Sequence, residues 1–414
     1  MGNGQNLTSK ASQSSHPLPR EGGRGERSHP VGTSNDGNPS VAIVGGGPAG
    51  MALALALDKH GVATQIFDAR PRGAARDDKR ILALSHGSRQ ILEWLGVWPQ
   101  IAATRINAIH VSQRGGLGRT RLMAGEEGVP ALGYVAAVAS VGAALDDALA
   151  TTQIPFRAET RVGKVDSLAD EVRLHTDDGK TSVPARLVVY AEGAIQPGDD
   201  AATVTRDYGQ HAMICTATPA APHRNLAYER FTAQGPLAIL PFGAELAVVY
   251  TCPSAEAAAL AALPDAEFLA RLHEHFGGRL AFAAISPRHV FPLALRYRKF
   301  PVGPRTVWLG NAAQTLHPVA GQGFNLALRD TWELARTLAD AADPGDPAVL
   351  DRYARARRLD RHCVIGFTDT LIRVFGSNDP LLRHARGLGL LALDLLPPAR
   401  SFVARRMLFG ARAW

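Results

Sequence analysis

Two glycine-rich segments contain the residues whose types and spacing are suited to binding a charged cofactor. The first, residues 45–50, has the form G-x-G-x-x-G and follows an apolar run at residues 41–44. The second, residues 310–330, follows another apolar run at residues 306–309. A glycine-rich turn between a strand and a helix directs backbone N–H groups and the positive end of the helix dipole at one point. Each segment therefore suits an anionic or electron-rich ligand, although the second, taken alone, would be interpreted as an ordinary strand–turn–helix connection.

The first segment has the full context of a dinucleotide-binding turn. Gly45 allows a tight turn, Gly47 lets the backbone approach a pyrophosphate, and Gly50 lets the helix pack on the sheet. A second strand follows at residues 64–67, and it is closed by Asp68, 18 residues after Gly50. An acid at this place accepts hydrogen bonds from an adenosine ribose. The combination predicts a dinucleotide site rather than a structural turn.

Composition limits the class of protein. The chain has 414 residues, of which 46% are hydrophobic and 20% charged, so its composition is that of a globular protein. Its length is sufficient for two hydrophobic cores. Cys215, Cys252 and Cys363 are far apart and form no C-x-x-C pair. This spacing argues against a disulfide framework or a zinc site and fits a reducing compartment. We therefore predict no metal centre.

The formal charge of +7 is concentrated near the C-terminus. Residues 383–414 contain six arginines and one acid, Asp394, mixed with leucines. An excess of basic residues spread over the whole chain would suggest binding to nucleic acid. Because the excess is concentrated in one segment, we do not predict nucleic acid as a partner. The leucine-rich basic segment is compatible both with a helix on anionic lipid and with an ordinary core-packing helix. No apolar run reaches the roughly 18 residues of a spanning helix, and no secretory signal is present.

The order of patterns predicts an α/β fold in which a Rossmann-like domain is interleaved with an antiparallel-sheet substrate domain. A C-terminal helical segment completes the chain. The predicted parts are a disordered tail at residues 1–39, the nucleotide domain at 40–105, 140–200 and 300–345, the substrate domain at 106–139 and 201–299, and the helical segment at 346–414. Interleaving of this kind places a small-molecule cleft between the two domains.

Three motifs in this order resemble those of the class A FAD-dependent aromatic hydroxylases. They are the loop at residues 45–50, the pair Glu192-Gly193 and the block at residues 310–330. The block reads GNAAQTLHPVAGQGFNLALRD and looks like that of the ubiquinone-biosynthesis hydroxylases, closest to the 2-polyprenyl-6-methoxyphenol hydroxylase branch. The sequence YERF at residues 228–231 also resembles that branch. The likeness covers roughly residues 40–410 and implies that the Rossmann-like domain binds FAD.

The resemblance assigns roles residue by residue. The first loop and Asp68 would hold the ADP half of FAD, and Arg80 matches an arginine that helps to hold the cofactor. Pro318 would lie beside the isoalloxazine ring, whose pyrimidine edge would receive backbone groups of residues 323–325. The complete predicted set is Gly45, Gly47, Pro48, Ala49, Gly50, Asp68, Arg80, Glu192, Gly193, Gly310, Asn311, Pro318, Gly321, Gln322, Gly323, Phe324 and Asn325 for the cofactor, with His317 and Pro318 as catalytic candidates.

Two positions depart from the class pattern. Asn311 stands where most class A enzymes have Asp, which removes a charge but keeps the capacity for hydrogen bonds. Glu192 replaces the Asp of the usual Asp-Gly pair, a residue tied in the class to both FAD and NAD(P)H. The electron donor therefore stays open between NAD(P)H and another reductant.

The resemblance also implies the chemistry. Reduced flavin would react with O2 to give a C4a-hydroperoxide, whose distal oxygen is attacked by an electron-rich phenol ring. The protein would position the ring and exclude water. His317 is a candidate acid–base group, although a histidine before this proline more often shapes the loop.

The leading hypothesis is a cytoplasmic enzyme, peripheral on the inner membrane, that hydroxylates a polyprenylated phenol in ubiquinone biosynthesis, together with other proteins of that pathway. One alternative is a class A hydroxylase of a soluble aromatic compound. A second is a non-catalytic flavin-fold subunit of a quinone-biosynthesis complex. A flavin halogenase lacks support because the W-x-W-x-I-P signature is missing, and a two-dinucleotide reductase would need a second G-x-G-x-x-G motif.

Overall fold

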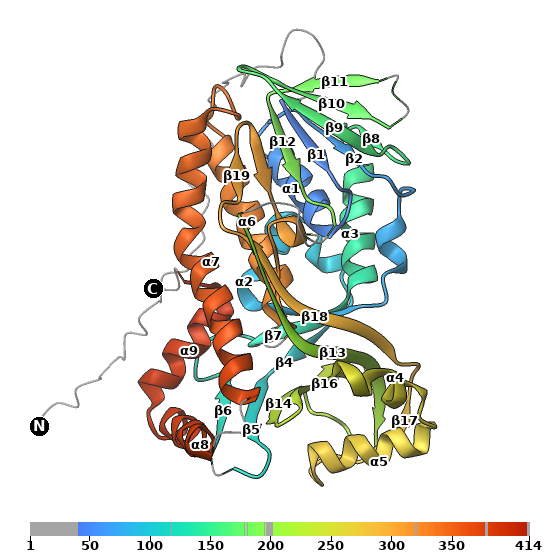
Figure 1. Cartoon of the computed structure of the whole chain (residues 1–414), viewed down its shortest axis with the longest axis vertical. Coiled ribbons are helices and arrows are strands. Elements are labelled where there is room, and N and C mark those ends of the chain that lie inside the picture. Colours follow the sequence, from blue (N-terminus) through green and yellow to red (C-terminus); the bar gives the residue numbers. More distant parts are fainter. Residues whose placement is uncertain are drawn as a thin grey trace, which may run out of the picture.

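A parallel sheet built around β1 holds the first glycine-rich segment (Figure 1). The computed structural model describes residues 40–411, with gaps at 117, 178, 180, 194, 196–201, 319–320 and 377–379, so the predicted tail lies outside the described residues. The sheet has the order β19-β20-β12-β1-β2-β8. Its strands are β1 (Val41–Val44), β2 (Thr64–Phe67), β8 (Phe156–Arg157), β12 (Leu187–Tyr190), β19 (Val302–Gly303) and β20 (Thr306–Trp308). All four residues of β1 are buried, as expected of a central parallel strand covered on both faces.

Two different layers cover the faces of this sheet. On one face lie α1 (Pro48–Asp58), α3 (Val138–Ala150) and α6 (Gln322–Leu338), which share one apolar core with β1 and β2. On the other face lies a three-stranded antiparallel sheet of β9 (Val162–Ser167), β10 (Val172–Thr176) and β11 (Ser182–Ala185). The alternation of apolar residues in β10 matches this one-sided burial.

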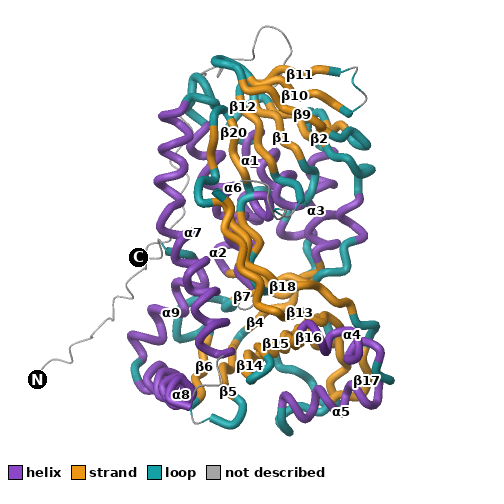
Figure 2. Tube along the Cα trace, in the orientation of Figure 1, coloured by secondary structure: helices purple, strands orange, loops and turns teal. Residues whose placement is uncertain are grey.

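A second large sheet of nine strands forms the other half of the molecule (Figure 2). Its order is β21-β18-β13-β16-β15-β14-β5-β6, and β17 pairs with β13 off this path. The pairs are antiparallel except for β14 with β5. The strands are β5 (Ala108–Gln113), β6 (Arg119–Met123), β13 (Thr203–Pro219), β14 (Leu226–Thr232), β15 (Gly235–Phe242), β16 (Glu245–Pro253), β17 (Phe282–Ile285), β18 (His289–Arg298) and β21 (Gln314–Thr315). Helices α4 (Ser254–Ala262) and α5 (Asp265–Phe276) pack against it.

A small sheet lies between the two halves. It has the order β3-β7-β4, formed by β3 (Ile81–Ser85), β7 (Gly133–Ala137) and β4 (Ala103–Ile106), with α2 (His86–Trp94) after β3. Residues 106–139 therefore contribute β5 and β6 to the nine-stranded sheet and β7 to the small one.

Three helices form the C-terminal segment: α7 (Pro347–Gly376), α8 (Pro380–Leu395) and α9 (Pro397–Phe409). Figure 1 shows α7 running along one side from the parallel sheet to the nine-stranded sheet, where α8 and α9 lie. The predicted fold class, a Rossmann-like domain interleaved with a second sheet and followed by helices, is confirmed. No single helix of the described chain is long and apolar enough to cross a membrane, whereas His384–Leu395 and Pro397–Phe409, bent by 98°, pass that test only as a pair.

A buried ionic cluster joins α6 to α7. Arg357 donates from Nε to Oδ1 of Asp330 at 2.6 Å and from Nη2 to Oδ2 of Asp360 at 2.6 Å. Arg329 donates to the same Asp360 oxygen at 2.8 Å, and the backbone N–H of Ala411 donates to Oδ1 of Asp360 at 2.8 Å. Breaking one partner of a buried pair leaves an uncompensated charge, so the cluster fixes α6, α7 and the end of α9 together.

Candidate active site

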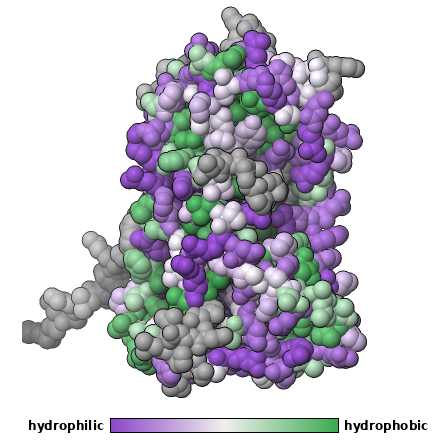
Figure 3. Space-filling model, in the orientation of Figure 1, coloured by the Kyte–Doolittle hydropathy of each residue, from purple (hydrophilic) through white to green (hydrophobic). Residues whose placement is uncertain are grey.

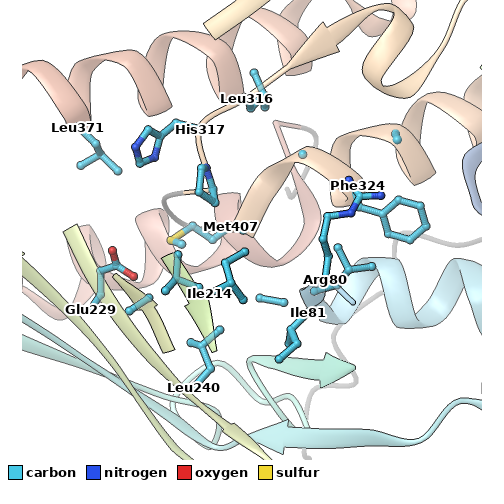
Figure 4. Close-up of a pocket in the computed structure, with 18 of the residues that line it drawn as sticks. Arg80, Ile81, Ile214, Glu229, Leu240, Leu316, His317, Phe324, Leu371 and Met407 are labelled. Atoms are coloured by element: carbon cyan, nitrogen blue, oxygen red, sulfur yellow. The ribbon is translucent and has the colours of Figure 1, made fainter. Parts of the chain in front are cut away.

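A cavity of about 1440 Å³ lies between the parallel sheet, the nine-stranded sheet and the C-terminal helices. Figure 4 shows a close-up of this cavity, with Arg80 and Phe324 on one side and Glu229 and Leu240 on the other. Both glycine-rich segments reach it, because Gly47 and Gly323 are among the lining residues. Since the two segments are more than 250 residues apart in the chain, the fold alone brings them to one site.

The turn after β1 is held closed by the absence of side chains. A Cβ on Gly50 would lie 2.0 Å from the carbonyl oxygen of Gly45, and a Cβ on Gly45, whose φ is +113°, would lie 2.6 Å from the backbone nitrogen of Glu192. Gly47, in contrast, faces open space, with only an Arg70 atom within 4 Å of the position of a Cβ. This glycine begins α1, which no side chain of the described residues caps. The first backbone N–H groups of α1 are thus directed at the cavity.

Asp68, at the end of β2, is buried beside this turn. Its Oδ2 accepts the backbone N–H of Gly46 at 2.7 Å, and Arg70 donates to both carboxylate oxygens from Nε and Nη2 at 3.1 and 3.0 Å. Burial alone raises the pKa of Asp68, but the hydrogen bonds from Arg70 and Gly46 outweigh it, so the pKa lies below its ordinary value. The carboxylate is therefore charged at neutral pH and ties the turn to the strand end.

Two further predicted residues lie at this end of the cavity. Arg80 makes a bidentate pair with Asp78, from Nε to Oδ1 at 3.0 Å and from Nη2 to Oδ2 at 2.6 Å, and about half of its side chain is exposed. Glu192 follows β12, and burial, with the nearby charge of Asp68, raises its pKa above the ordinary value. This end of the cavity is thus lined by charged groups of both signs.

The second glycine-rich segment approaches the same cavity through the start of α6. Gly321, with a φ of +59°, begins that helix, and a Cβ there would lie 2.9 Å from the Cβ of Ala83. The Asn325 side chain makes four hydrogen bonds that fix the helix start. It donates to the carbonyl oxygens of Ala83 and Gly321 at 2.8 and 2.7 Å, and accepts from the N–H of Ser85 and the hydroxyl of Ser88 at 2.8 and 2.6 Å.

His317 lines the cavity just before Pro318 and is 1% exposed. Its ring meets the ring of Tyr208 edge to face at 5.9 Å, and the Tyr208 hydroxyl donates to Asp369 of α7 at 2.9 Å. Burial lowers the pKa of His317 to about 4, so the imidazole is neutral at physiological pH. A neutral, packed histidine connects the loop to β13 and α7.

The sequence model of the FAD binding domain family matches residues 38–367. The chain belongs to this family. It is 33% identical to the ubiquinone hydroxylase UbiL of Rhodospirillum rubrum over 390 residues, which cover 91% of each chain. It is 31% identical to the 3-demethoxyubiquinol 3-hydroxylase of Escherichia coli over 369 residues, covering 86% of this chain and 94% of that one. The protein is therefore an FAD-dependent aromatic hydroxylase, and the predicted resemblance to the ubiquinone-biosynthesis hydroxylases is confirmed at the level of the family.

Solved structures show the same fold. The p-nitrophenol 4-monooxygenase PnpA of Pseudomonas putida superimposes with a TM-score of 0.72 at 18% identity, covering 91% of this chain and 99% of that one. At this identity the likeness concerns the fold alone.

The residues present fit FAD. The uncapped start of α1 and the open space at Gly47 leave room for a diphosphate, and the exposed guanidinium of Arg70 lies where it can give way to a ribose. Of the predicted residues, those lining the cavity are Gly47, Pro48, Ala49, Asp68, Arg80, Glu192, Gly193, Gly310, Asn311, His317, Pro318, Gly321, Gly323 and Phe324. Gly45, Gly50, Gln322 and Asn325 do not line it. Two of these four, Gly50 and Asn325, lie behind the lining and hold its backbone in place.

The other end of the cavity was not predicted residue by residue. It is lined by apolar side chains of the nine-stranded sheet and of the C-terminal helices, among them Ile109, Leu122, Ile214, Leu240, Leu371, Leu390, Leu393 and Met407. The hydroxylase thus uses α7, α8 and α9 as cavity walls, a role that the leucine-rich pattern did not distinguish from membrane binding. One charged side chain of the sheet, Glu229 on β14, also lines this apolar end, and the only sequence signal for it was the YERF motif.

Proposed function

We propose that this hydroxylase adds a hydroxyl group to the ring of a polyprenylated phenol in ubiquinone biosynthesis, using FAD, O2 and an electron donor that is either NAD(P)H or another reductant. The names of the relatives support this substrate class, since UbiL is a ubiquinone hydroxylase and the Escherichia coli relative a 3-demethoxyubiquinol 3-hydroxylase. The resemblance to the branch of 2-polyprenyl-6-methoxyphenol hydroxylases stays a prediction, and intermediate profiling identifies the ring position.

The observation that supports this proposal best is the apolar end of the cavity. The lining continues from Ile214 and Leu240 to Leu390, Leu393 and Met407, well beyond the residues predicted to surround the flavin. A substrate with an isoprenoid tail buries apolar area here at about 25 cal/mol per Å². A small soluble phenol would leave much of this lining without contact.

The residues of the charged end are suited to hold FAD. The backbone N–H groups at the start of α1 would bind the diphosphate, and Asp68 would accept hydrogen bonds from the ribose in exchange for those from Arg70. When bound, FAD supplies the redox chemistry that activates O2 and transfers one oxygen atom to the ring.

The start of α6 and the loop before it would hold the reacting end. Gly323 and Phe324 lie in the first turn of α6, where the positive end of the helix dipole stabilises negative charge. Pro318 would limit the position of the ring, and the neutral His317 would shape the loop rather than transfer a proton. Apolar walls exclude water from this space.

We also propose that α8 and α9 contact a lipid surface through which the substrate enters. One side of α8 lines the cavity with Leu390 and Leu393, while Leu388 and Leu395 are 66% and 67% exposed. Figure 3 shows hydrophobic side chains at the lower left edge of the molecule, where Figure 1 places α8 and α9. Exposed leucines on α8, together with the half-exposed Arg405 of α9, suit an anionic membrane surface.

Intermediate profiling in a deletion strain tests the proposed function. We expect a polyprenylated phenol lacking one ring hydroxyl to accumulate, and its structure names the position. The wild-type gene should restore the quinone, whereas Gly47→Trp, which fills the space for the diphosphate, should not. A strain with a normal quinone profile, or full rescue by Gly47→Trp, would contradict the proposal.

A further inference from the structure

Glu229 is a carboxyl group placed in the apolar end of the cavity. It lies on β14, where it pairs with Val111 of β5 and Ala238 of β15, and all three residues line the cavity. The ring of the preceding residue, Tyr228, meets that of Phe276 edge to face at 5.2 Å, and Tyr228 also lines the cavity. In Figure 4, Glu229 projects from the sheet towards the side of the cavity where His317 and Leu371 lie.

The Oε1 atom of Glu229 is shielded from solvent and has no hydrogen-bond partner among the described residues. The arginines that line this end are engaged elsewhere. Arg386 donates to the carbonyl oxygens of Val374 and Phe375, each at 2.8 Å, and Arg400 pairs with Glu126 at 3.2 Å. A carboxylate oxygen that is shielded from water and has no partner is costly, so a polar ligand atom is the natural partner of Oε1.

We propose that Glu229 binds the ring hydroxyl of the phenolic substrate and accepts its proton during hydroxylation. This inference rests on the proposed function for the identity of the substrate as a phenol. The cavity joins the position of Glu229 to the loop of His317 and Pro318, so a ring held at Oε1 would lie within the same space as the reacting end of the cofactor site.

The chemistry of a carboxyl group in this environment fits the role. Burial raises the pKa of Glu229 to about 7, closer to the value of about 10 that is typical of a phenol. A base with a pKa near the working pH is the most effective in proton transfer. The other titratable or charged groups lining this end are Tyr228, His317, Arg386 and Arg400, and burial alone causes the shift.

The proton transfer balances as follows. The O–H bond of the ring hydroxyl breaks, its electron pair stays on the ring oxygen, and the proton bonds to the carboxylate of Glu229, which becomes neutral. The ring is then more electron-rich and reacts more readily with the oxygen that FAD chemistry supplies. After oxygen transfer, the substituted ring carbon loses its hydrogen as a proton to water, and Glu229 returns its proton to the ring oxygen.

Calorimetric binding to the FAD-loaded enzyme tests the contact. The probes are 2-prenylphenol and its methyl ether, which differ only in the ring hydroxyl. We expect wild-type protein to bind the phenol at least about tenfold more tightly, because a hydrogen bond to a charged group is lost in the ether. Glu229→Leu should bind the two probes equally, and Glu229→Gln should keep most of the preference because its amide oxygen still accepts. Glu267→Gln, on the exposed face of α5, is the matched control and should behave as wild type.

Turnover separates proton transfer from binding. Glu229→Gln should lose about 10²-fold in kcat, and the wild-type rate should fall as pH drops below about 7 while the variant lacks this dependence. Equal binding of both probes by wild type, an unchanged preference in Glu229→Leu, or a wild-type rate in Glu229→Gln would overturn the proposal. If the enzyme turns over no polyprenylated phenol, the proposed function fails, while the comparison of the two probes still decides the role of Glu229.

Discussion

The two ends of the cavity are built in opposite ways. The charged end consists of backbone turns whose shape depends on missing side chains, as at Gly50 and Gly321. The apolar end consists of side chains that project from strands and from the C-terminal helices, such as Leu240 and Leu390. A backbone site tolerates almost no change of residue, whereas a side-chain wall tolerates any apolar residue of suitable volume. Sequence motifs therefore identify the residues of the cofactor end, whereas no motif identifies those of the substrate end.

The buried ionic cluster fixes α6, which borders the cofactor end of the cavity, to α7, which borders the apolar end. We expect its removal to have the largest effect on stability. Arg357→Met leaves Asp330 and Asp360 facing each other without their shared cation. We expect a loss of about 3–5 kcal/mol in the free energy of unfolding, measured by denaturant titration. Arg355→Met, at an exposed pair with Asp351 on the same helix, is the control and should change stability by at most about 0.5 kcal/mol. Equal effects of the two variants would contradict the role of the cluster.

The charged end should fail when a single Cβ is added. Gly50→Val places its Cβ 2.0 Å from the Gly45 carbonyl oxygen, so the turn must open. We expect loss of FAD from the purified protein and a destabilisation of about 1–3 kcal/mol or more, read from flavin absorbance and thermal unfolding. Gly366→Ala, exposed on α7 with nothing within 4 Å, should keep FAD and stabilise the helix by about 0.5–1 kcal/mol. Normal FAD content in Gly50→Val would contradict the claim that the cofactor end depends on missing side chains.

The lipid-facing side of the apolar end can be tested without touching the cavity. Leu388→Glu with Leu395→Glu should lower binding to anionic vesicles by about tenfold or more, because two exposed leucines no longer insert. Co-sedimentation measures this change, and turnover of a short-tailed phenol in solution should stay at the wild-type rate. Leu168→Glu, 48% exposed beside the β9–β10 hairpin, is the matched control and should bind vesicles normally. Unchanged partitioning of the double variant would favour a purely structural role for α8.

The smallest expected effect is that of His317. Its pKa is lowered to about 4 in the fold, below the ordinary value near 6.5. The unfolded chain therefore binds the proton more readily between these values, and the contribution of a neutral His317 to stability is lost as pH falls from about 6.5 to 4. We expect His317→Asn to weaken this acid sensitivity in thermal unfolding. The pH dependence of its kcat above pH 5 should parallel that of wild type, and a lost ionisation there would instead indicate acid–base catalysis.

The residues that could be predicted from the sequence belong mainly to the cofactor end of the cavity. Residues 45–50, Asp68 and the block at 310–330 could be placed because each needs particular backbone geometry at a fixed spacing. Their meeting at one cavity agrees with the prediction, as does the C-terminal helical segment. The position of Asn325 behind the lining could not be read, because its four partners come from β3, α2 and the turn before α6.

The apolar end could not be predicted for a physical reason. Ile214, Leu240 and Leu390 follow the alternation of any half-buried strand or helix, so nothing distinguishes a cavity wall from a core position. In the sequence, Glu229 stood out only as part of the YERF motif. Its role in the cavity could not be predicted, because it depends on the apolar residues that β5 and β15 place around it. Tertiary pairing, and not local pattern, creates that environment.

The hydrogen bond from Ala411 to Asp360 has a consequence for the order in which the molecule is completed. Residues of α9 such as Val403 and Met407 form part of the cavity wall, and they are synthesised after every residue of the nucleotide-binding sheet. A growing chain can thus assemble the parallel sheet and its glycine turn while the substrate end still lacks a side. Capture of Ala411 by a carboxylate already shared with Arg329 and Arg357 closes that side. A chain without α9 would therefore lack Val403 and Met407 from the wall of the substrate end.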